Sequence, residues 1–495
     1  MTEFELKFEV PPASLKSVAG AVLEGKATRQ RLQASYFDTA DGALAAHGIV
    51  VRLRKEGRRW IQTAKGPTAD FLERLEHNVV LPSGPAGAGP TLDLKRHMGT
   101  PVGKIIDQAL GLKAGNDYPR LDLLYGTDIQ RITRLVTCGS SVMEVALDQG
   151  RVFGDGHSQP ICELEVELKE GSPRDAVALA RQWCAGHGLW MSTITKSMKG
   201  QRLRSATPFG DATSAIFLKF SRKISGHEMV AAVVAACLSQ ILPNMSELAC
   251  GSSHRDHIHQ LRVGIRRLRT ALRELDGLTD AIDPTWEAAL VQTFRALGAH
   301  RDYSHLALVL QPQLLAAGGP DMQVADANSN VPDGRKTVRV AEFQDALLGL
   351  LGFVHGETPK TTDTPDALKP AISLRLEKLR KGALRDGKRF LVLDEAKQHN
   401  VRKRLKRLRY LMEFAAPLFG IRKVRHMTSA LKPVQDALGL YNDELMALHA
   451  WRAMTTDDPN AWFGIGWLTA RRQPNARRCL EEIKAFAGIK PFWRR

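Results

Sequence analysis

Charged and apolar residues alternate strictly at the start of the chain. From Glu3 to Val10 every odd-numbered position is charged and every even-numbered position is apolar. Successive side chains of a β-strand point to opposite faces, so the pattern predicts a strand with one apolar face. The other face carries three carboxylates and one ammonium group. Taken alone, this stretch fits an amphipathic edge strand with its charges in water equally well.

The same alternation returns repeatedly within the first two hundred residues. Some segments present cations on one face, as Arg52 and Arg54 do, and others present carboxylates, as the segment from Glu163 to Glu167 does. The strand-like segments are 33–39, 49–55, 60–66, 74–81, 121–134, 141–147 and 161–169. Turns and short helical stretches separate them, which predicts an antiparallel meander.

A closed barrel with a polar lumen accounts for acidic and basic strands in one meander. Three carboxylates in a row repel one another unless a cation lies among them, and facing Arg and Lys side chains repel unless an anion does. A lumen with both sets suits a polyphosphate and a divalent metal, because Mg²⁺ and Mn²⁺ prefer hard oxygen ligands. The alternative is a single-layered sheet with these charges in solvent.

Several motifs in this region resemble the CYTH domain of the triphosphate tunnel metalloenzymes. They are the E-x-E-x-K opening at Glu3–Lys7, the segment Tyr36–Thr39, Arg52 with Arg54, Lys65, Glu144 with Asp148, and Glu163 with Glu165 and Glu167. The resemblance covers about residues 1–205. It implies an eight-stranded antiparallel tunnel that hydrolyses a triphosphate with Mg²⁺ or Mn²⁺.

The resemblance also implies roles for individual residues. Metal ligands would be Glu3, Glu5, Asp148, Glu163, Glu165 and Glu167. Phosphate oxygens would be bound by Lys7, Arg52, Arg54, Lys65, Arg131 and Lys196. The residues assigned to catalysis are Glu5, Lys7, Lys65 and Glu165. The fifth strand departs from the family pattern R-x-E-x-E, because Asn78 stands where a carboxylate is usual.

The second half of the chain has helical periodicity and an internal repeat. Between His259 and Arg273 an apolar stripe runs beside a basic stripe, as in a helix with one buried face. The H-x-x-R-x-x-x-[RK]-R-L-R motif at His259 returns at His399, an offset of 140 residues, and an L-G-x-x-x-D motif returns at an offset of 141. Two basic stripes without acidic partners predict a bound polyanion.

These repeated motifs resemble the CHAD domain from residue 216 to the C-terminus. The resemblance implies two pseudo-symmetric four-helix bundles that bind inorganic polyphosphate. Its binding residues would be His259, Arg262, Arg266, Arg269, His399, Arg402, Lys406 and Arg409. Nucleic acid is disfavoured as the polyanion, because few aromatic residues for base stacking lie along the stripes. The predicted organisation is a tunnel domain at 1–205, a linker at 206–215 and a helical domain at 216–495, with repeats at 216–355 and 370–495.

Composition agrees with this division. The chain of 495 residues has a formal net charge of +17, of which +4 falls in residues 1–205 and +13 in the remainder. A polyanion is therefore expected on the second half. The six cysteines form no C-x-x-C pair, which favours reduced thiols in a cytosolic protein. With no apolar leader and no long apolar run, we expect a soluble cytoplasmic protein, with polyphosphate granules as one location and no membrane partner.

The combined prediction is an α+β protein with a metal-dependent inorganic triphosphatase domain and a polyphosphate-binding helical domain. The triphosphatase would convert triphosphate to pyrophosphate and phosphate. Two alternatives stay open on the sequence alone. One is a non-catalytic protein of polyphosphate granules, which Asn78 favours. The other is a CYTH enzyme that acts on a different triphosphate, such as ATP or thiamine triphosphate.

Overall fold

The computed structural model describes residues 2–68, 72–82, 89–113, 117–321, 333–356 and 365–494. The chain divides into two compact units. Unit 1 contains residues 1–212 together with 242–252 and 338–356, and unit 2 contains residues 213–241, 253–337 and 357–495. Each unit is described by itself below.

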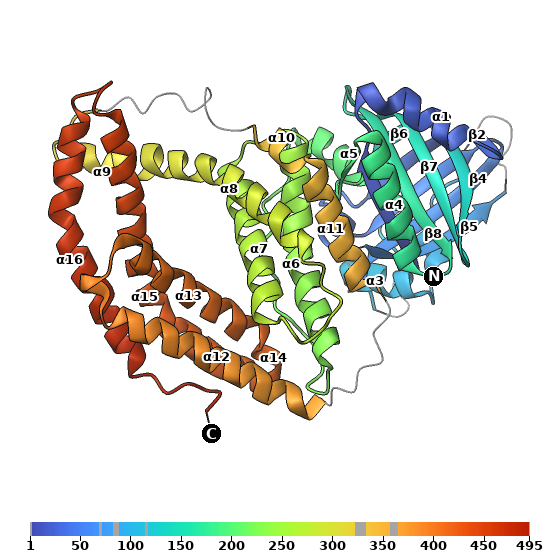
Figure 1. The fold of residues 1–495 in the computed structure, drawn as a ribbon. Coiled ribbons are helices and arrows are strands. Elements are labelled where there is room, and N and C mark those ends of the chain that lie inside the picture. The colour runs from blue at the N-terminus through green and yellow to red at the C-terminus, as the bar shows by residue number, and fades with distance from the viewer. Residues whose placement is uncertain are drawn as a thin grey trace. The chain divides into compact units, whose positions relative to one another are not determined.

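Unit 1 contains a closed antiparallel barrel (Figure 1). Neighbouring strands pair in the order β5-β4-β3-β2-β6-β7-β8-β1, and β1 pairs again with β5, so eight strands close on themselves. The strands are β1 (Thr2–Glu9), β2 (Ala27–Asp38), β3 (Val50–Glu56), β4 (Arg59–Pro67), β5 (Glu73–Leu81), β6 (Asp122–Cys138), β7 (Ser141–Gly154) and β8 (His157–Glu170). The predicted eight-stranded antiparallel barrel is therefore confirmed.

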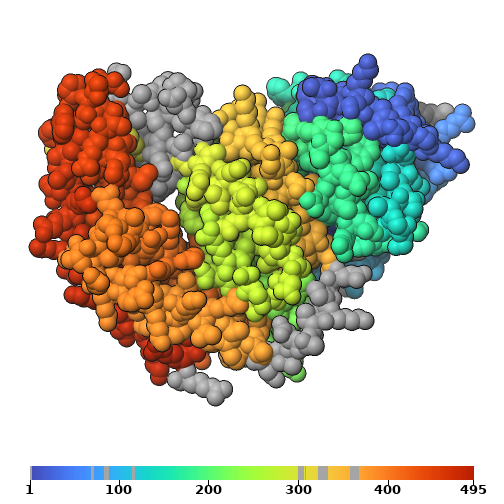
Figure 2. Space-filling model, in the orientation of Figure 1, coloured from blue at the N-terminus to red at the C-terminus, as the bar shows by residue number. Residues whose placement is uncertain are grey.

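The alternating pattern turns the charged face of the strands inward. In β1 the apolar residues Phe4, Leu6 and Phe8 are buried on the outer face of the barrel. Helix α4 (Pro173–His187) packs against β1, β7 and β8, helix α1 (Leu15–Leu23) against β6 and β7, and helix α3 (Pro101–Ala109) against β4 and β5. The side chains of α1 (blue) and α4 (green) lie over the barrel in Figure 2. One hydrophobic cluster thus lies between the barrel and α3. Charged residues face the lumen, and a second cluster contributes Leu32, Tyr36 and Ile129 to its lining.

Two short elements complete the barrel. Strand β9 (Trp190–Met191) pairs with β1, and helix α5 (Lys196–Ser205) packs against β6, β7 and β8. Thr195 caps α5, because its side chain accepts a hydrogen bond from the backbone N–H of Met198. The cap fixes the start of the helix, and Lys196 is its first residue.

The described residues from Gly226 onward are mostly helical, as predicted. The long helices are α6 (Gly226–Ala249), α7 (Arg255–Glu274), α8 (Thr285–His305), α11 (Ala341–Val354), α12 (Pro365–Gly387), α13 (Glu395–Phe414), α15 (Ile421–Met454) and α16 (Ala461–Ala487). A π-helical turn (Leu306–Leu310) and the short helices α9 (Gln311–Ala316), α10 (Gly334–Val338) and α14 (Ala416–Phe419) connect them. Helix α13 begins and ends 140 residues after α7, in agreement with the repeat in the sequence.

Helix α6 is more apolar than the sequence analysis suggested. By length and composition alone it could cross a membrane, with a mean hydropathy of 1.6 over its most apolar window. Most of that window, 72%, is buried inside the protein, as expected for a core helix.

The buried side chain of His97 contacts His77, a partly buried residue of strand β5. The side-chain oxygen of Gln62 accepts hydrogen bonds from the backbone N–H of Asp93 and from Arg96, so its Nε2 donates to Nε2 of His97 at 2.9 Å. The ring of His97 therefore carries its proton on Nδ1, which lies 2.9 Å from Nδ1 of His77. Burial, followed by the charges of His77 and Arg96, lowers the pKa of His97 to about 4.

This pKa predicts acid sensitivity. Because the folded pKa of His97 lies below the usual value of 6.5, the unfolded chain takes up the proton first as the pH falls. The neutral His97 ring therefore contributes its full share to the free energy of unfolding above pH 6.5. This contribution, at most about 3 kcal/mol, is lost as the pH falls from 6.5 to 4. His97→Gln should reduce the loss of unfolding free energy between pH 7 and 5, measured by urea denaturation. The exposed His157→Gln serves as the control, and equal pH dependence in all three proteins would contradict this assignment.

Candidate functional site

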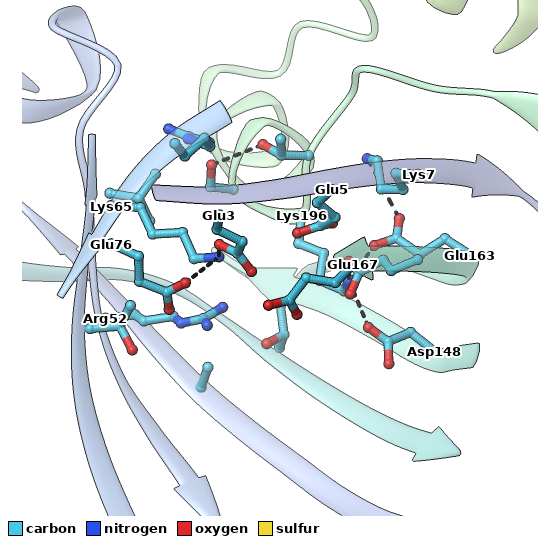
Figure 3. A pocket seen from close by; sticks show the side chains of 18 of the residues that line it. Glu3, Glu5, Lys7, Arg52, Lys65, Glu76, Asp148, Glu163, Glu167 and Lys196 are labelled. Atoms are coloured by element: carbon cyan, nitrogen blue, oxygen red, sulfur yellow. Dashed lines mark hydrogen bonds and ion pairs between the residues drawn. The ribbon is translucent and has the colours of Figure 1, made fainter. Parts of the chain in front are cut away.

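The barrel encloses a cavity of about 340 Å³ lined by charged side chains. Strands β1, β3, β4, β6, β7 and β8 and helix α5 all contribute to it. All twelve tunnel residues predicted from the sequence line this one cavity, namely Glu3, Glu5, Lys7, Arg52, Arg54, Lys65, Arg131, Asp148, Glu163, Glu165, Glu167 and Lys196. In Figure 3 Glu3, Lys65, Glu76 and Arg52 lie on one side, with Lys7, Glu163 and Asp148 on the other.

Three carboxylates meet on the wall formed by β7 and β8. One oxygen atom of each of Asp148, Glu163 and Glu165 lies within 4.8 Å of the others, which is a spacing that could hold a metal ion. Asp148 and Glu163 are fully buried and lie opposite each other in the β7–β8 register. We call Asp148, Glu163 and Glu165 the carboxylate trio. Glu167 lines the same cavity, but its carboxylate pairs with Lys169 at 2.6 Å.

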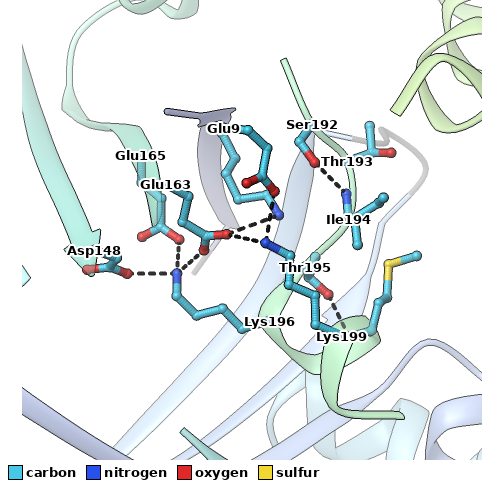
Figure 4. Close-up of polar contacts among 12 residues, drawn as sticks. Glu9, Asp148, Glu163, Glu165, Ser192, Thr193, Ile194, Thr195, Lys196 and Lys199 are labelled. Carbon is cyan, nitrogen blue, oxygen red and sulfur yellow. Dashed lines mark hydrogen bonds and ion pairs between the residues drawn. The ribbon is translucent and has the colours of Figure 1, made fainter. Parts of the chain in front are cut away.

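The ammonium group of Lys196 lies among the trio. Its Nζ is 2.7 Å from Oδ2 of Asp148 and 2.6 Å from Oε1 of Glu165, and it also contacts Glu163 (Figure 4). Arg131 donates two hydrogen bonds to Asp148, each of 2.6 Å, and contacts Glu165 as well. The cation that three adjacent carboxylates require is thus supplied by the chain itself.

These cations keep Glu163 and Glu165 ionised. Burial alone would raise the pKa of Glu163, but the ammonium groups of Lys196, Lys7 and Lys199 outweigh it and lower the pKa to about 2. Burial is likewise outweighed at Glu165, whose pKa lies well below its usual value because of Lys196 and Arg131. Ionised, clustered and buried carboxylates are a donor set that fits a hard divalent cation.

The opposite wall holds a second acidic group around Lys65. Its Nζ lies 2.5 Å from Oε2 of Glu3 and 3.2 Å from Oε2 of Glu76. Burial, opposed by the charge of Lys65 and reinforced by the hydrogen bond with Glu76, raises the pKa of Glu3 to about 8. Burial and the charge of Glu165 raise the pKa of Glu5 to about 7. Glu3 and Glu5 therefore hold protons more readily than Glu163 and Glu165 do.

Asn78 has a defined structural role in this wall. Its Nδ2 donates to Oε1 of Glu76 at 2.9 Å, and its Oδ1 accepts from the hydroxyl of Thr63 at 2.7 Å. The amide that replaces a carboxylate thus orients Glu76. The predicted residue set omitted Glu76 and Arg74, which also line the cavity. Their spacing at period two on β5 was the signal that could have identified them.

Several cations face the cavity with unsatisfied nitrogen atoms. Among the residues that the structure describes, Nζ of Lys7 and the Nε atoms of Arg52 and Arg54 are buried without a hydrogen-bond partner. The nearest carboxylate oxygen to Lys7, from Glu163, lies at 3.8 Å, beyond hydrogen-bond range. Burial lowers the pKa of Lys7. Buried donors without partners are costly, and an anion with several oxygen atoms would satisfy them.

Residues from distant parts of the chain hold the segment that carries Lys196. The backbone N–H of Met191 donates to Oε1 of Gln344 at 2.9 Å, and that of Thr193 donates to the hydroxyl of Ser246 at 3.0 Å. The guanidinium of Arg339 lies 3.7 Å from the ring centroid of Trp190. All of these residues belong to unit 1. No sequence motif indicated them, because the contacts join segments more than fifty residues apart.

Unit 2 contains a separate groove of about 780 Å³. Seven of the eight predicted polyanion-binding residues line it, namely His259, Arg262, Arg266, Arg269, His399, Arg402 and Lys406. Further basic residues that the prediction missed are Arg273, Arg295, Lys403, Arg404 and Arg407. The two basic stripes of α7 and α13 therefore face one shared groove.

Arg409 does not belong to the residues that line this groove. Its Nε donates to Oε1 of Glu413 at 2.7 Å, one helical turn further along α13. In α7 the residue equivalent to Glu413 is Arg273, which lines the groove. A carboxylate in place of that arginine therefore holds the Arg409 guanidinium outside it.

A closed antiparallel barrel whose lumen holds interleaved carboxylates and cations defines the class of unit 1. A family model described as the CYTH domain matches residues 1–200, and one described as the CHAD domain matches residues 232–452. The chain therefore carries a CYTH domain and a CHAD domain, and both predicted resemblances are confirmed.

The chain is also similar to individual proteins. An inorganic triphosphatase of Haemophilus influenzae is 28% identical over 176 residues, which cover 34% of this chain and 45% of that relative's length. The CHAD domain from the plant Ricinus communis is 24% identical with a TM-score of 0.47, covering 57% of this chain and 98% of that one. A putative adenylyl cyclase from Hippeastrum, described as having a dominant triphosphatase activity, is 16% identical with a TM-score of 0.30, covering 41% of this chain and 96% of that one.

Proposed function

We propose that the tunnel hydrolyses inorganic triphosphate to pyrophosphate and phosphate with Mg²⁺ or Mn²⁺, and that the groove in unit 2 binds inorganic polyphosphate. The observation that supports the tunnel activity most strongly is the pairing of two features in one cavity. The carboxylate trio shares the cavity with Lys7, Arg52 and Arg54, and Nζ of Lys7 and the Nε atoms of both arginines are buried without a hydrogen-bond partner. A phosphate chain accompanied by a divalent cation would satisfy both.

The residues of the tunnel divide into two roles under this proposal. The trio, together with Glu3 and Glu5, would hold the divalent ion, which would neutralise phosphate oxygens and polarise the phosphorus when bound. Lys7, Arg52 and Arg54 would bind the phosphate chain. Lys196 would leave the trio and bind phosphate oxygens, because a divalent cation replaces its charge among the carboxylates.

Hydrolysis then needs positioning and charge stabilisation rather than a covalent intermediate. A water oxygen forms a bond to a terminal phosphorus in line with the P–O bond that breaks, and the proton that the water loses is released to the solvent. The leaving pyrophosphate gains negative charge on the bridging oxygen, and the fixed ammonium and guanidinium groups stabilise that charge. Lys65 and Arg131 lie in the same cavity and would supply part of this stabilisation.

The composition of the cavity favours inorganic triphosphate over a nucleotide. Among the described residues that line it, Tyr36 is the single aromatic one. Its ring already stacks on Tyr125, with centroids 4.8 Å apart. Tyr36 is also only 3% exposed, so a nucleobase or a thiazolium ring would find little aromatic surface on which to stack. Phosphate release from triphosphate, ATP, thiamine triphosphate and long polyphosphate tests this directly, and a preference for ATP would reject the proposed substrate.

The contacts to the Lys196 segment predict a smaller effect on rate. Ser246→Ala removes the hydroxyl that accepts from the Thr193 N–H, so Lys196 should be less well positioned and kcat should fall by about tenfold with little change in KM. Ser239→Ala is the matched control, because that hydroxyl bonds within its own helix α6. Steady-state kinetics on triphosphate compares the two. An unchanged kcat in Ser246→Ala would show that the hydrogen bond does not position Lys196.

A further inference from the structure

Three guanidinium groups of α7 lie around one aromatic ring on α8. The guanidinium carbons of Arg262, Arg266 and Arg269 are 4.3, 5.4 and 5.9 Å from the ring centroid of Phe294. Arg262 also donates from Nη1 to the backbone carbonyl of Phe294 at 2.6 Å. Like charges this close repel one another, and the negative face of an aromatic ring offsets part of that repulsion.

A glycine one turn along α8 makes room for the first of these arginines. A Cβ atom at Gly298 would lie 2.9 Å from Nη1 of Arg262, which is closer than real Cβ contacts. Glycine inside a helix costs about 1 kcal/mol relative to alanine. The absence of a side chain at Gly298 leaves space for the Arg262 guanidinium, which explains why a glycine fits this helical position.

The second repeat has equivalents of both positions at an offset of 141 residues. At these positions it has neither an aromatic ring nor a guanidinium close to the glycine. The position equivalent to Phe294 is Gln435, whose side chain accepts from Arg409 and donates to the carbonyl of Leu405. The position equivalent to Gly298 is Gly439, where an added Cβ atom would meet nothing within 4 Å. The two halves of the groove thus share basic residues but differ in how α8 and α15 support them.

We propose that Phe294 and Gly298 are positioning residues that hold the α7 arginines ready for phosphate, so that the α7–α8 half of the groove binds the polyanion more tightly than the α13–α15 half. This inference rests on the proposed binding of polyphosphate in the groove. Side chains that are already ordered lose less conformational freedom when the anion binds. Affinity then depends on residues that carry no charge.

The test uses the full chain and inorganic polyphosphate of one defined length, titrated at several salt concentrations. Phe294→Leu and Gly298→Ala should each weaken binding by about fivefold to tenfold. The salt dependence should stay unchanged, because the number of cations is unchanged. Phe294→Tyr, which keeps the ring, and Gly439→Ala, the matched glycine in the other repeat, should bind within about twofold of the wild type.

The outcomes separate this inference from the proposed function. A wild-type protein that does not bind polyphosphate rejects the function of the groove, and the positioning role with it. Wild-type binding that Phe294→Leu and Gly298→Ala leave intact rejects the positioning role alone. Equal losses in Gly298→Ala and Gly439→Ala would reject the difference between the two halves. Circular dichroism and thermal unfolding of each variant show whether the helices are kept, and a loss of affinity that follows only a loss of helix also counts against the inference.

Discussion

Glu165→Gln is expected to abolish metal-dependent hydrolysis of triphosphate while the barrel stays folded. Glu165 contributes one of the three carboxylates that lie within 4.8 Å of one another, and its charge is held by Lys196 and Arg131. An amide keeps the shape of the side chain but removes one negative charge from the trio, so a divalent cation would bind less tightly. The rate should fall by at least about 100-fold, since changes even outside the direct ligands of a metal cost 10–100-fold. Glu5→Gln should behave in the same way.

Glu144→Gln is the matched control for these variants. Glu144 lines the same cavity from β7, but its carboxylate lies 3.6 Å from Lys169, and it does not belong to the trio. The same chemical change there should leave most of the activity. Phosphate release is measured for all three variants at saturating Mg²⁺ and Mn²⁺, with circular dichroism to confirm the fold. Full activity in Glu165→Gln with an unchanged spectrum would remove the carboxylate trio from the mechanism.

The second large effect is expected in the groove of unit 2. Replacing Arg262 and Arg266 by alanine removes two cations from α7, and replacing Arg402 and Lys406 removes two from α13. If both helices face one polyanion, each pair should weaken polyphosphate binding by one order of magnitude or more. Each lost contact should also reduce the slope of log affinity against log salt by about 0.9, the value for phosphates of duplex nucleic acid.

Lys432→Ala is a suitable control for charge alone. This exposed lysine pairs with Asp436 on α15 and does not line the groove. Its loss lowers the net charge but should leave the salt slope close to that of the wild type. If the slope stays constant in both double variants as well, the basic residues do not share one ligand and the groove is not a polyphosphate site.

The barrel and its lining could be predicted because the sequence pattern is local. Alternation at period two fixes which side chains of a strand share a face. The twelve individual residues were implied by the resemblance to the CYTH domain, and all of them line the one cavity. Glu76 was missed although it keeps period two with Asn78 on its strand and matches the family pattern. The structure shows that this asparagine holds Glu76 in place.

The supporting contacts could not be predicted from such patterns. Ser246 and Gln344 contact the segment before Lys196 through the tertiary fold, and nothing in their local sequence distinguishes them from other helical residues. The repeat offset makes Arg409 the equivalent of Arg269, which lines the groove. One helical turn further on, however, α13 has Glu413 where α7 has Arg273, and Glu413 accepts a hydrogen bond from the Arg409 guanidinium. Repeats thus predict which helices correspond, while the side-chain partners decide which cations face the ligand.

The most direct measurement is the product analysis of inorganic triphosphate incubated with the full-length protein, first treated with a chelator and then resupplied with Mg²⁺ or Mn²⁺. The proposed function predicts no hydrolysis after chelation and recovery upon addition of the metal. It also predicts one phosphate and one pyrophosphate for each triphosphate consumed, as followed by phosphorus NMR. Hydrolysis that continues at the same rate without metal, or triphosphate that binds in the presence of metal and is never cleaved, would contradict it.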